Sequence, residues 1–272
     1  MFEDLSKVVL LSDMDGTLLN DKKEITETDR AAIERFVSLG GRFSVATGRT
    51  LQSFEQYRAM IELPHPVIMY NGAAIHDYST GETLCTHPLP DDARAIAEAV
   101  LREMPEVGGE VLRTDGTYVF RNNDYQKLHT KLCNIVPNYT ELEDIPDGGW
   151  LKVLFAMSPE DMDYFGVLVR QMGWTQASFV RSSGMFWEML PNGVSKGSAL
   201  TEYRSLPGFE GTEFVSVGDF DNDIEMIEAA DLGACPANAE DSVKAAAGLV
   251  LRRTNEEGAV AELIGRLING LK

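Results

Sequence analysis

The chain has 272 residues, 44% of them apolar, which is enough for one large or two modest domains with buried cores. Its 43 acidic residues outnumber its 24 basic residues, and the formal net charge of -19 argues against nucleic acid or an anionic membrane as the main partner. The longest early apolar run, residues 8–11, is too short for a membrane span or a signal-peptide core, so we expect a cytoplasmic protein.

Short apolar runs alternate with amphipathic helices over residues 7–76, which indicates a parallel sheet with helical crossovers. The runs are "VVLLS" at 8–12, "RFSVAT" at 42–47 and "PVIMYNGAAI" at 66–75, and a helix is expected from about Thr26. The same alternation returns after residue 212 with "EFVSVGD", "LGACPA" and "GLVL", and with helices after Asn222, near Asp241 and from about Glu256. We therefore expect both ends of the chain to share one sheet.

Residues 84–188 have a different pattern, which predicts an inserted α+β domain. A helix is expected at 91–103, a hairpin at Asp115-Gly116, and a second hairpin from "TQASFVRS" and "MFWEML". Ser158 and its neighbours open another helix, and Gly173 is its expected end. All three tryptophans fall in this insert, where we interpret them as core anchors. The prediction is an α/β core at 1–83 and 189–272 around an insert at 84–188.

Polar and small residues follow each apolar run, at the carboxyl ends of the predicted parallel strands, where open sheets bind ligands. They are Asp13, Asp15, Gly16 and Thr17, then Thr47, Gly48 and Arg49, then Asn71 and Gly72, and finally Gly218, Asp219, Asn222 and Asp223. Two acidic clusters in neighbouring loops would collect several negative charges. A hard divalent cation with oxygen ligands would neutralise them, and Mg²⁺ is the natural candidate.

Two other motifs have competing interpretations. "DFDND" is similar to the start of a calcium-binding EF-hand loop, but positions six and twelve hold Ile224 and Ala230 instead of glycine and glutamate. "GVSKG" at 193–197 matches a serine-hydrolase nucleophile motif, but all four histidines precede Ser195, which reverses the required order. Lys196 is the more informative residue, because a lysine beside an acidic metal site can bind a phosphoryl oxygen.

Four motifs in order, "DMDGT", "TGR", "GVSKG" and "GDFDND", together with "NGA" at 71–73, resemble those of the haloacid dehalogenase-like (HAD) phosphatases. The specific resemblance is to the Cof-type branch, type IIB with a C2 cap, and it covers the whole chain. It implies a Rossmann-like parallel-sheet core with an inserted α+β cap that selects the substrate.

The resemblance also implies a role for each motif residue. Asp13 would be the nucleophile that forms an aspartyl-phosphate, and Asp15 the general acid and base. Mg²⁺ would be held by Asp13, by the backbone carbonyl of Asp15 and by Asp219. Thr47, Gly48 and Lys196 would hold the phosphoryl group. The implied supporting residues are Gly16, Thr17, Arg49, Asn71, Asn222 and Asp223.

The leading hypothesis is therefore a Mg²⁺-dependent phosphatase of small phosphorylated metabolites, either sugar phosphates or phosphorylated cofactors, acting as a monomer or homodimer. A phosphomutase of the same superfamily would use the same nucleophile. A non-catalytic regulator that binds a phosphorylated metabolite is the alternative from another class, although such a protein has no need for Asp15. Within the insert, Arg113, Tyr125, His129 and Arg181 do not identify the substrate, because each is as readily a surface or packing residue.

Overall fold

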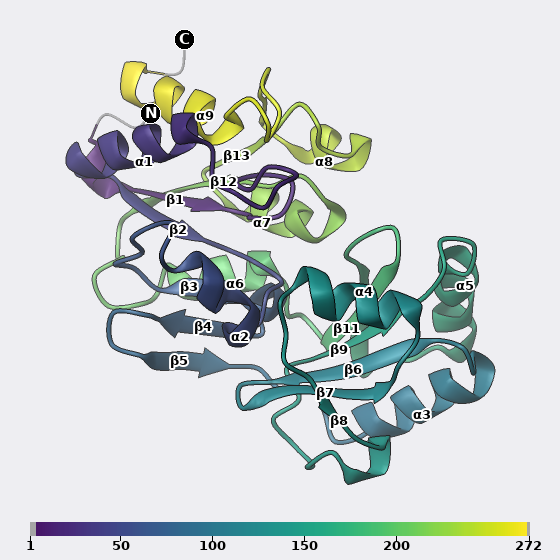
Figure 1. Cartoon of the computed structure of the whole chain (residues 1–272). Coiled ribbons are helices and arrows are strands. Elements are labelled where there is room, and N and C mark those ends of the chain that lie inside the picture. Colours follow the sequence, from purple (N-terminus) through teal and green to yellow (C-terminus); the bar gives the residue numbers. More distant parts are fainter. Residues whose placement is uncertain (1–3, 271–272) are drawn as a thin grey trace. The chain divides into compact units, whose positions relative to one another are not determined.

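The computed structural model describes residues 4–270, and the chain divides into two compact units. The first unit consists of Met1–Gly48, Tyr57–Cys85 and Ser195–Lys272, and the second of Arg49–Gln56 and Thr86–Val194. The first unit thus combines segments from both ends of the chain. Figure 1 shows both units, with labels on many of their elements.

The main sheet of the first unit is parallel, with the strand order β14-β13-β12-β1-β2. Its strands are β1 (Val8–Ser12), β2 (Arg42–Val45), β12 (Glu213–Val217), β13 (Leu232–Cys235) and β14 (Leu249–Val250). β1 pairs with β12 from Val8 opposite Glu213 to Ser12 opposite Val217. The prediction that the two ends of the chain share one sheet is confirmed.

Helices cover both faces of this sheet. α1 (Glu27–Ser38) and α9 (Ala259–Asn269) pack together on one face, and α6 (Lys196–Tyr203) and α7 (Ile224–Ala229) pack together on the other, as Figure 1 shows. α8 (Asp241–Ala246) follows β13. α1 begins as predicted, because the Thr26 side chain accepts a hydrogen bond from the backbone N–H of Asp29. Burial of β1 between helices explains why all five of its residues are buried.

The apolar run at 66–75 does not form one parallel strand. The structure divides it into β3 (Val67–Met69) and β4 (Ala74–Asp77), which pair antiparallel and are followed by β5 (Glu82–Thr86). Tyr70, Asn71 and Gly72 have φ angles of 52°, 56° and 100°, and this left-handed stretch reverses the chain. A parallel bridge between Ala46 and Ile68 still places β3 beside the end of β2.

The second unit contains a six-stranded sheet with the order β10-β11-β9-β6-β7-β8. Its strands are β6 (Gly108–Arg113), β7 (Gly116–Arg121), β8 (Asn138–Tyr139), β9 (Lys152–Ala156), β10 (Ala177–Arg181) and β11 (Phe186–Pro191). Its helices are α2 (Leu51–Phe54), α3 (Ala93–Glu103), α4 (Asp124–Leu132) and α5 (Met162–Met172). Both predicted hairpins are confirmed, since β6 pairs antiparallel with β7 and β10 with β11. α5 ends as predicted at Gly173, whose φ of 62° suits glycine.

The tryptophans of the second unit belong to its core, as the sequence indicated. Trp150 is buried in a cluster with side chains of α3, α5 and the central strands, and Trp174 and Trp187 pack against that cluster. Trp187 also donates a hydrogen bond of 3.2 Å to the Met162 carbonyl oxygen, which satisfies its polar group.

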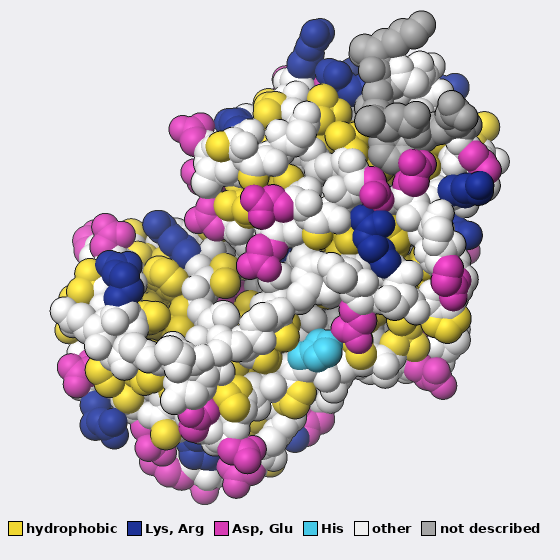
Figure 2. Space-filling model, turned by 180° about the vertical axis from the view of Figure 1, so that it is seen from behind, with side chains coloured by type: hydrophobic (Ala, Val, Ile, Leu, Met, Phe, Trp, Pro, Cys, Tyr) yellow, Lys and Arg dark blue, Asp and Glu magenta, His cyan; other side chains and the backbone are white. Residues whose placement is uncertain are grey.

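The surface shows how the charges are distributed. On the face shown in Figure 2, Lys and Arg side chains are scattered among Asp and Glu, and the described residues form no broad basic surface there. None of the helices in residues 4–270 combines the length and apolar character that a membrane crossing requires.

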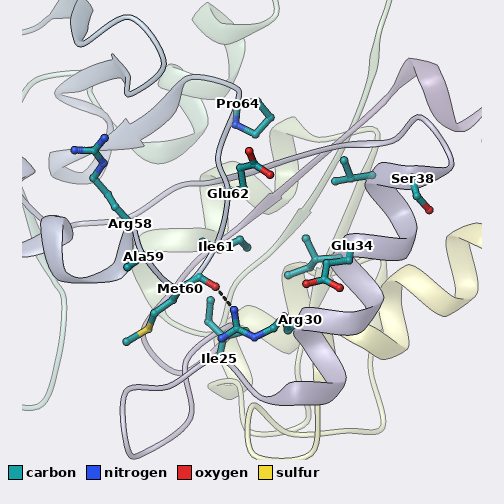
Figure 3. A pocket seen from close by; sticks show the side chains of 12 residues that line it. Ile25, Arg30, Glu34, Ser38, Arg58, Ala59, Met60, Ile61, Glu62 and Pro64 are labelled. Carbon is teal, nitrogen blue, oxygen red and sulfur yellow. Dashed lines mark hydrogen bonds between the residues drawn. The ribbon is translucent and has the colours of Figure 1, made fainter.

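A cavity of about 570 Å³ lies in the first unit between α1 and residues 58–64 (Figure 3). Ile25 and Ile33 form part of its apolar lining, and the Arg30 guanidinium donates a hydrogen bond to the Met60 carbonyl oxygen. Residues 58–64 precede β3, so this segment approaches the amino end of that strand. The motif residues follow the carboxyl ends of the strands, and none of them lines this cavity.

Candidate active site

A buried lysine joins two of the acidic motif residues. Asp13 directly follows β1, and its backbone N–H continues the sheet pairing by donating to the Val217 carbonyl oxygen at 2.8 Å. Lys196 is the first residue of α6, behind a cap in which Ser195 and Ser198 exchange hydrogen bonds. The Lys196 ammonium nitrogen lies 2.5 Å from Asp13 Oδ1 and 2.6 Å from Asp223 Oδ1. The strand end and the helix start therefore fix three buried charges in contact.

The "GDFDND" loop is folded around its last aspartate. Asp223 Oδ2 accepts hydrogen bonds from the backbone N–H groups of Asp219 and Phe220, at 3.0 and 3.2 Å. Asp219 Oδ1 in turn accepts a hydrogen bond of 2.6 Å from the Thr17 hydroxyl. Gly16 has a φ of 90°, and a Cβ atom there would overlap the Asp219 carboxylate. Gly16 and Thr17 therefore allow the first acidic motif to approach the last one closely.

Burial and mutual repulsion perturb these carboxyl groups. Burial raises the pKa of Asp13 well above its ordinary value, Lys196 opposes the rise, and the charges of Asp223 and Asp219 add to it. Burial, followed by the charge of Asp223, raises the pKa of Asp219 to about 7. Burial alone would lower the pKa of Lys196, but Asp13 and Asp223 outweigh it and raise that pKa. One ammonium group thus faces an excess of buried carboxylates.

The other two loops meet beside this cluster through backbone and amide contacts. The Thr47 N–H donates to the Ile68 carbonyl oxygen at 2.8 Å, and the Asn71 N–H donates to the Thr47 carbonyl oxygen at 3.1 Å. Asn222 Nδ2 donates to Asn71 Oδ1 at 3.0 Å. A Cβ atom on Gly48 would lie 2.8 Å from that same Asn71 oxygen, so the approach requires glycine. These contacts join the "TGR", "NGA" and "GDFDND" motifs.

Asp15 and Arg49 differ from these residues in exposure and in the unit to which they belong, respectively. Asp15 is half-buried, and its Oδ1 accepts a hydrogen bond of 2.7 Å from the Lys23 ammonium group. Arg49 belongs to the second unit, where it is buried. The first unit therefore brings together all the predicted site residues except Arg49.

Two residues that contact the predicted site residues were not predicted from the sequence. Lys23 lies in "NDKKE", which is typical of a solvated turn, so no local signal distinguishes it. Asn238 Nδ2 donates to the Gly16 carbonyl oxygen at 2.8 Å. Asn238 follows β13, and its position after the carboxyl end of that parallel strand could have identified it as a candidate site residue.

The acidic cluster has the donors that a hard cation needs. Asp13, Asp219 and Asp223 each offer a carboxylate oxygen, and these atoms lie within 4.8 Å of one another. Both oxygens of Asp223 accept hydrogen bonds, whereas no described residue donates one to Oδ2 of Asp13 or of Asp219. The cluster could therefore bind a divalent metal, with Asp13 and Asp219 as its better-placed ligands.

Comparison with known proteins identifies the family. A model of the haloacid dehalogenase-like hydrolases matches residues 10–264. The chain belongs to the haloacid dehalogenase-like hydrolases. The resemblance drawn from its motifs is thus confirmed, and so is the α/β fold that the resemblance implied.

Two curated relatives of this hydrolase are named phosphatases. The Bacillus subtilis 5-amino-6-(5-phospho-D-ribitylamino)uracil phosphatase YwtE is 30% identical over 285 residues, covering 95% of this chain and 97% of that protein. The Escherichia coli pyridoxal phosphate phosphatase YbhA is 25% identical, with 94% and 97% covered. The Thermotoga maritima TM0651 crystal structure is 28% identical with a TM-score of 0.76, covering 95% and 96%. The hydrolase is therefore an enzyme of the HAD phosphatase type.

Proposed function

We propose that this hydrolase is a Mg²⁺-dependent phosphatase that cleaves monoesters of small phosphorylated metabolites through an aspartyl-phosphate on Asp13. The observation that carries the proposal is the contact of Lys196 with both Asp13 and Asp223. Asp219 lies beside these two carboxylates, and Asp15 follows Asp13 by two residues. A nucleophile, a cation and a separate proton carrier then stand at one edge of the sheet.

Asp13 is the nucleophile in this proposal. Lys196 donates to its Oδ1, and the carboxylate supplies one oxygen to phosphorus and the other to the cation. A bond forms from Asp13 to phosphorus while the ester P–O bond breaks and its electron pair stays on the leaving oxygen. Splitting hydrolysis into two displacements lowers each barrier.

Asp15 carries the proton in both halves of the reaction. In the first half its carboxyl group gives a proton to the leaving oxygen. In the second half its carboxylate takes a proton from the water that attacks phosphorus, which releases phosphate and restores Asp13. A carboxyl group that is half-buried at the strand end, apart from the buried cluster, suits both proton release and proton uptake.

Lys196 and Thr47 would hold the phosphoryl oxygens. Lys196 supplies positive charge from a fully buried position, where charge interactions are stronger than in water. Asp223 fixes that ammonium group and the loop of Asp219, and Asn222 and Asn71 support the loop next to Thr47.

Mg²⁺ fits the donor set of Asp13, Asp219 and the Asp15 backbone carbonyl, which are hard oxygen ligands. When bound, it would neutralise charge between the anionic nucleophile and the anionic phosphate. The raised pKa values of Asp13 and Asp219 support such a cation, because burial and then the neighbouring carboxylates disfavour the charged forms, and Lys196 does not fully offset these effects.

Substrate choice, in this proposal, is set by the inserted domain. The residues assigned above all act on the phosphoryl group, so they do not distinguish one leaving group from another. YwtE and YbhA carry names with different phosphorylated substrates, a ribitylamino-uracil and pyridoxal phosphate. The substrate class proposed for this chain is correspondingly small sugar phosphates or phosphorylated cofactors.

The test is phosphate release from a panel of phosphorylated sugars and cofactors, with Mg²⁺ and with EDTA, for the wild type and Asp13→Asn. The proposal expects Mg²⁺-dependent release that the substitution abolishes without a loss of secondary structure by circular dichroism. Release that persists in the variant would exclude Asp13 as nucleophile. Tight binding of a panel member without any release would favour a binding protein instead.

A further inference from the structure

Lys23 is held in an unusual backbone conformation by a compact turn. Its φ is 62°, in the left-handed region that non-glycine residues seldom adopt. The turn is organised by Asn20, whose side-chain oxygen accepts hydrogen bonds from the N–H groups of Lys22 and Glu24 at 3.0 and 2.9 Å. Backbone bonds from Lys23 to Asn20 and from Asn20 to Glu24, at 2.8 and 3.0 Å, close it.

This turn is attached to the loop that carries Asp15. An isolated parallel bridge pairs Asp15 with Leu19, and an isolated antiparallel bridge pairs Leu19 with Ile25 at the end of the turn. Asn255 Nδ2 donates to the Leu19 carbonyl oxygen at 3.0 Å, which fixes Leu19 to a buried residue. The position of Lys23 relative to Asp15 is therefore determined by the backbone as well as by the side chains.

The strained conformation directs the Lys23 ammonium group to Asp15 Oδ1 at 2.7 Å. Both side chains are 40% exposed, and ion pairs with this exposure contribute little to stability. A left-handed lysine costs free energy of comparable size, so the pair has no evident net benefit to the fold. Strain held at a residue that contacts a reacting group indicates a functional role.

We propose that Lys23 is a positioning residue, which holds the Asp15 carboxyl group in the orientation that proton transfer to the leaving group requires. The inference rests on the proposed function, because it takes Asp15 as the proton carrier. Lys23 itself touches neither phosphorus nor the leaving oxygen. Its effect passes through the direction in which the second Asp15 oxygen points.

The leaving group reveals this role. As the bond from Asp13 to phosphorus forms and the ester bond breaks, an alkoxide from a sugar phosphate needs a proton from Asp15. The nitrophenolate of p-nitrophenyl phosphate is stable without one. A misdirected Asp15 therefore slows cleavage of the sugar phosphate and has little effect on cleavage of p-nitrophenyl phosphate. The ratio kcat/KM reports this step because it includes the first displacement.

The experiment measures kcat/KM of the wild type, Lys23→Gly, Lys23→Asn, Lys23→Arg and Lys22→Gly with a sugar phosphate and with p-nitrophenyl phosphate. Glycine and asparagine tolerate the left-handed conformation, so these variants remove the ammonium group and keep the turn. Lys22 is exposed in the same turn, so Lys22→Gly is the control variant that removes one positive charge from the turn.

We expect Lys23→Gly and Lys23→Asn to lose about tenfold or more with the sugar phosphate and less than about threefold with the nitrophenyl ester, as a partial loss of general acid catalysis. Lys23→Arg should recover most of the loss, and Lys22→Gly should match the wild type. Equal losses with both esters, a change confined to KM, or no change would each overturn the inference. A wild type inactive on both esters would instead refute the proposed function, and the inference with it.

Discussion

Replacing Lys196 with methionine tests how the buried charges are balanced. The side chain of Lys196 is fully buried, and those of its partners Asp13 and Asp223 are 9% and 1% exposed. Methionine keeps the approximate volume and removes the charge, which leaves three carboxyl groups within 4.8 Å of one another without a neighbouring ammonium. Breaking a buried pair in this way costs about 3–5 kcal/mol.

The expected loss is large enough to measure by thermal unfolding. For a domain of about 150–250 residues, each kcal/mol shifts Tm by about 2–4 °C, so Lys196→Met should lower Tm by roughly 6–20 °C in EDTA. Added Mg²⁺ should raise Tm more in the variant than in the wild type, because the cation replaces part of the missing charge. Phosphate release should fall by about 10² to 10³, as for loss of one transition-state donor.

The matched control is Lys127→Met. Lys127 pairs with Asp124 at 2.9 Å, a similar distance, but the two side chains are 59% and 92% exposed. An exposed pair contributes about 0.2–1 kcal/mol at most, so its Tm should change by only a few degrees. Equal Tm values for the two variants would refute the account of Lys196 as the cation that compensates buried carboxylates.

Two further predictions concern the second unit and the loop at Gly16. Burial alone would lower the pKa of His129, but Glu110 at 3.0 Å raises it from 6.5 to about 10. This pair stabilises the fold fully below pH 6.5, and its contribution is lost as pH rises through about 10. In urea unfolding, the free energy of unfolding of His129→Gln should therefore fall furthest below that of the wild type at pH 6, and the two values should converge near pH 10. A difference in unfolding free energy that does not change with pH would contradict this. Gly16→Ala should weaken Mg²⁺ binding, measured by calorimetry, because its Cβ overlaps the Asp219 carboxylate. The control Gly265→Ala has open space in α9, so it should bind Mg²⁺ normally and gain about 0.5–1 kcal/mol in stability. Equal Mg²⁺ affinities of the two variants would contradict the requirement for glycine at position 16.

The positions of the motif residues could be predicted because parallel strands bring their carboxyl ends to one edge. Asp13, Thr47 and Asp219 each follow a short buried run that the sequence shows plainly. The negative charges of Asp13 and Asp219 then indicate a cation as a ligand. The contact of Lys196 with two of the aspartates was harder to foresee, because it depends on how α6 approaches β1 across the fold.

The missed features have local causes. The left-handed turn at Tyr70 and Asn71 interrupts an apolar run, and an Asn-Gly pair within such a run is the only local sign of it. α4 was not predicted, because most of its nine residues are polar and its apolar face is short. Lys23 lies among other charged residues of a turn, and only its backbone angle and its contact with Asp15 distinguish it. Such features depend on conformation, which residue type alone does not specify.

The central claim is that Asp13 carries the phosphoryl group between the two displacements. The most direct test is an acid-quenched reaction with Mg²⁺ and the best substrate of the panel, followed by peptide mass spectrometry of the segment that contains Asp13 and Asp15. The account predicts an acyl phosphate on Asp13 during turnover and none in Asp13→Asn. Rapid phosphate release without phosphorylated Asp13, together with full activity of Asp13→Asn, would contradict it.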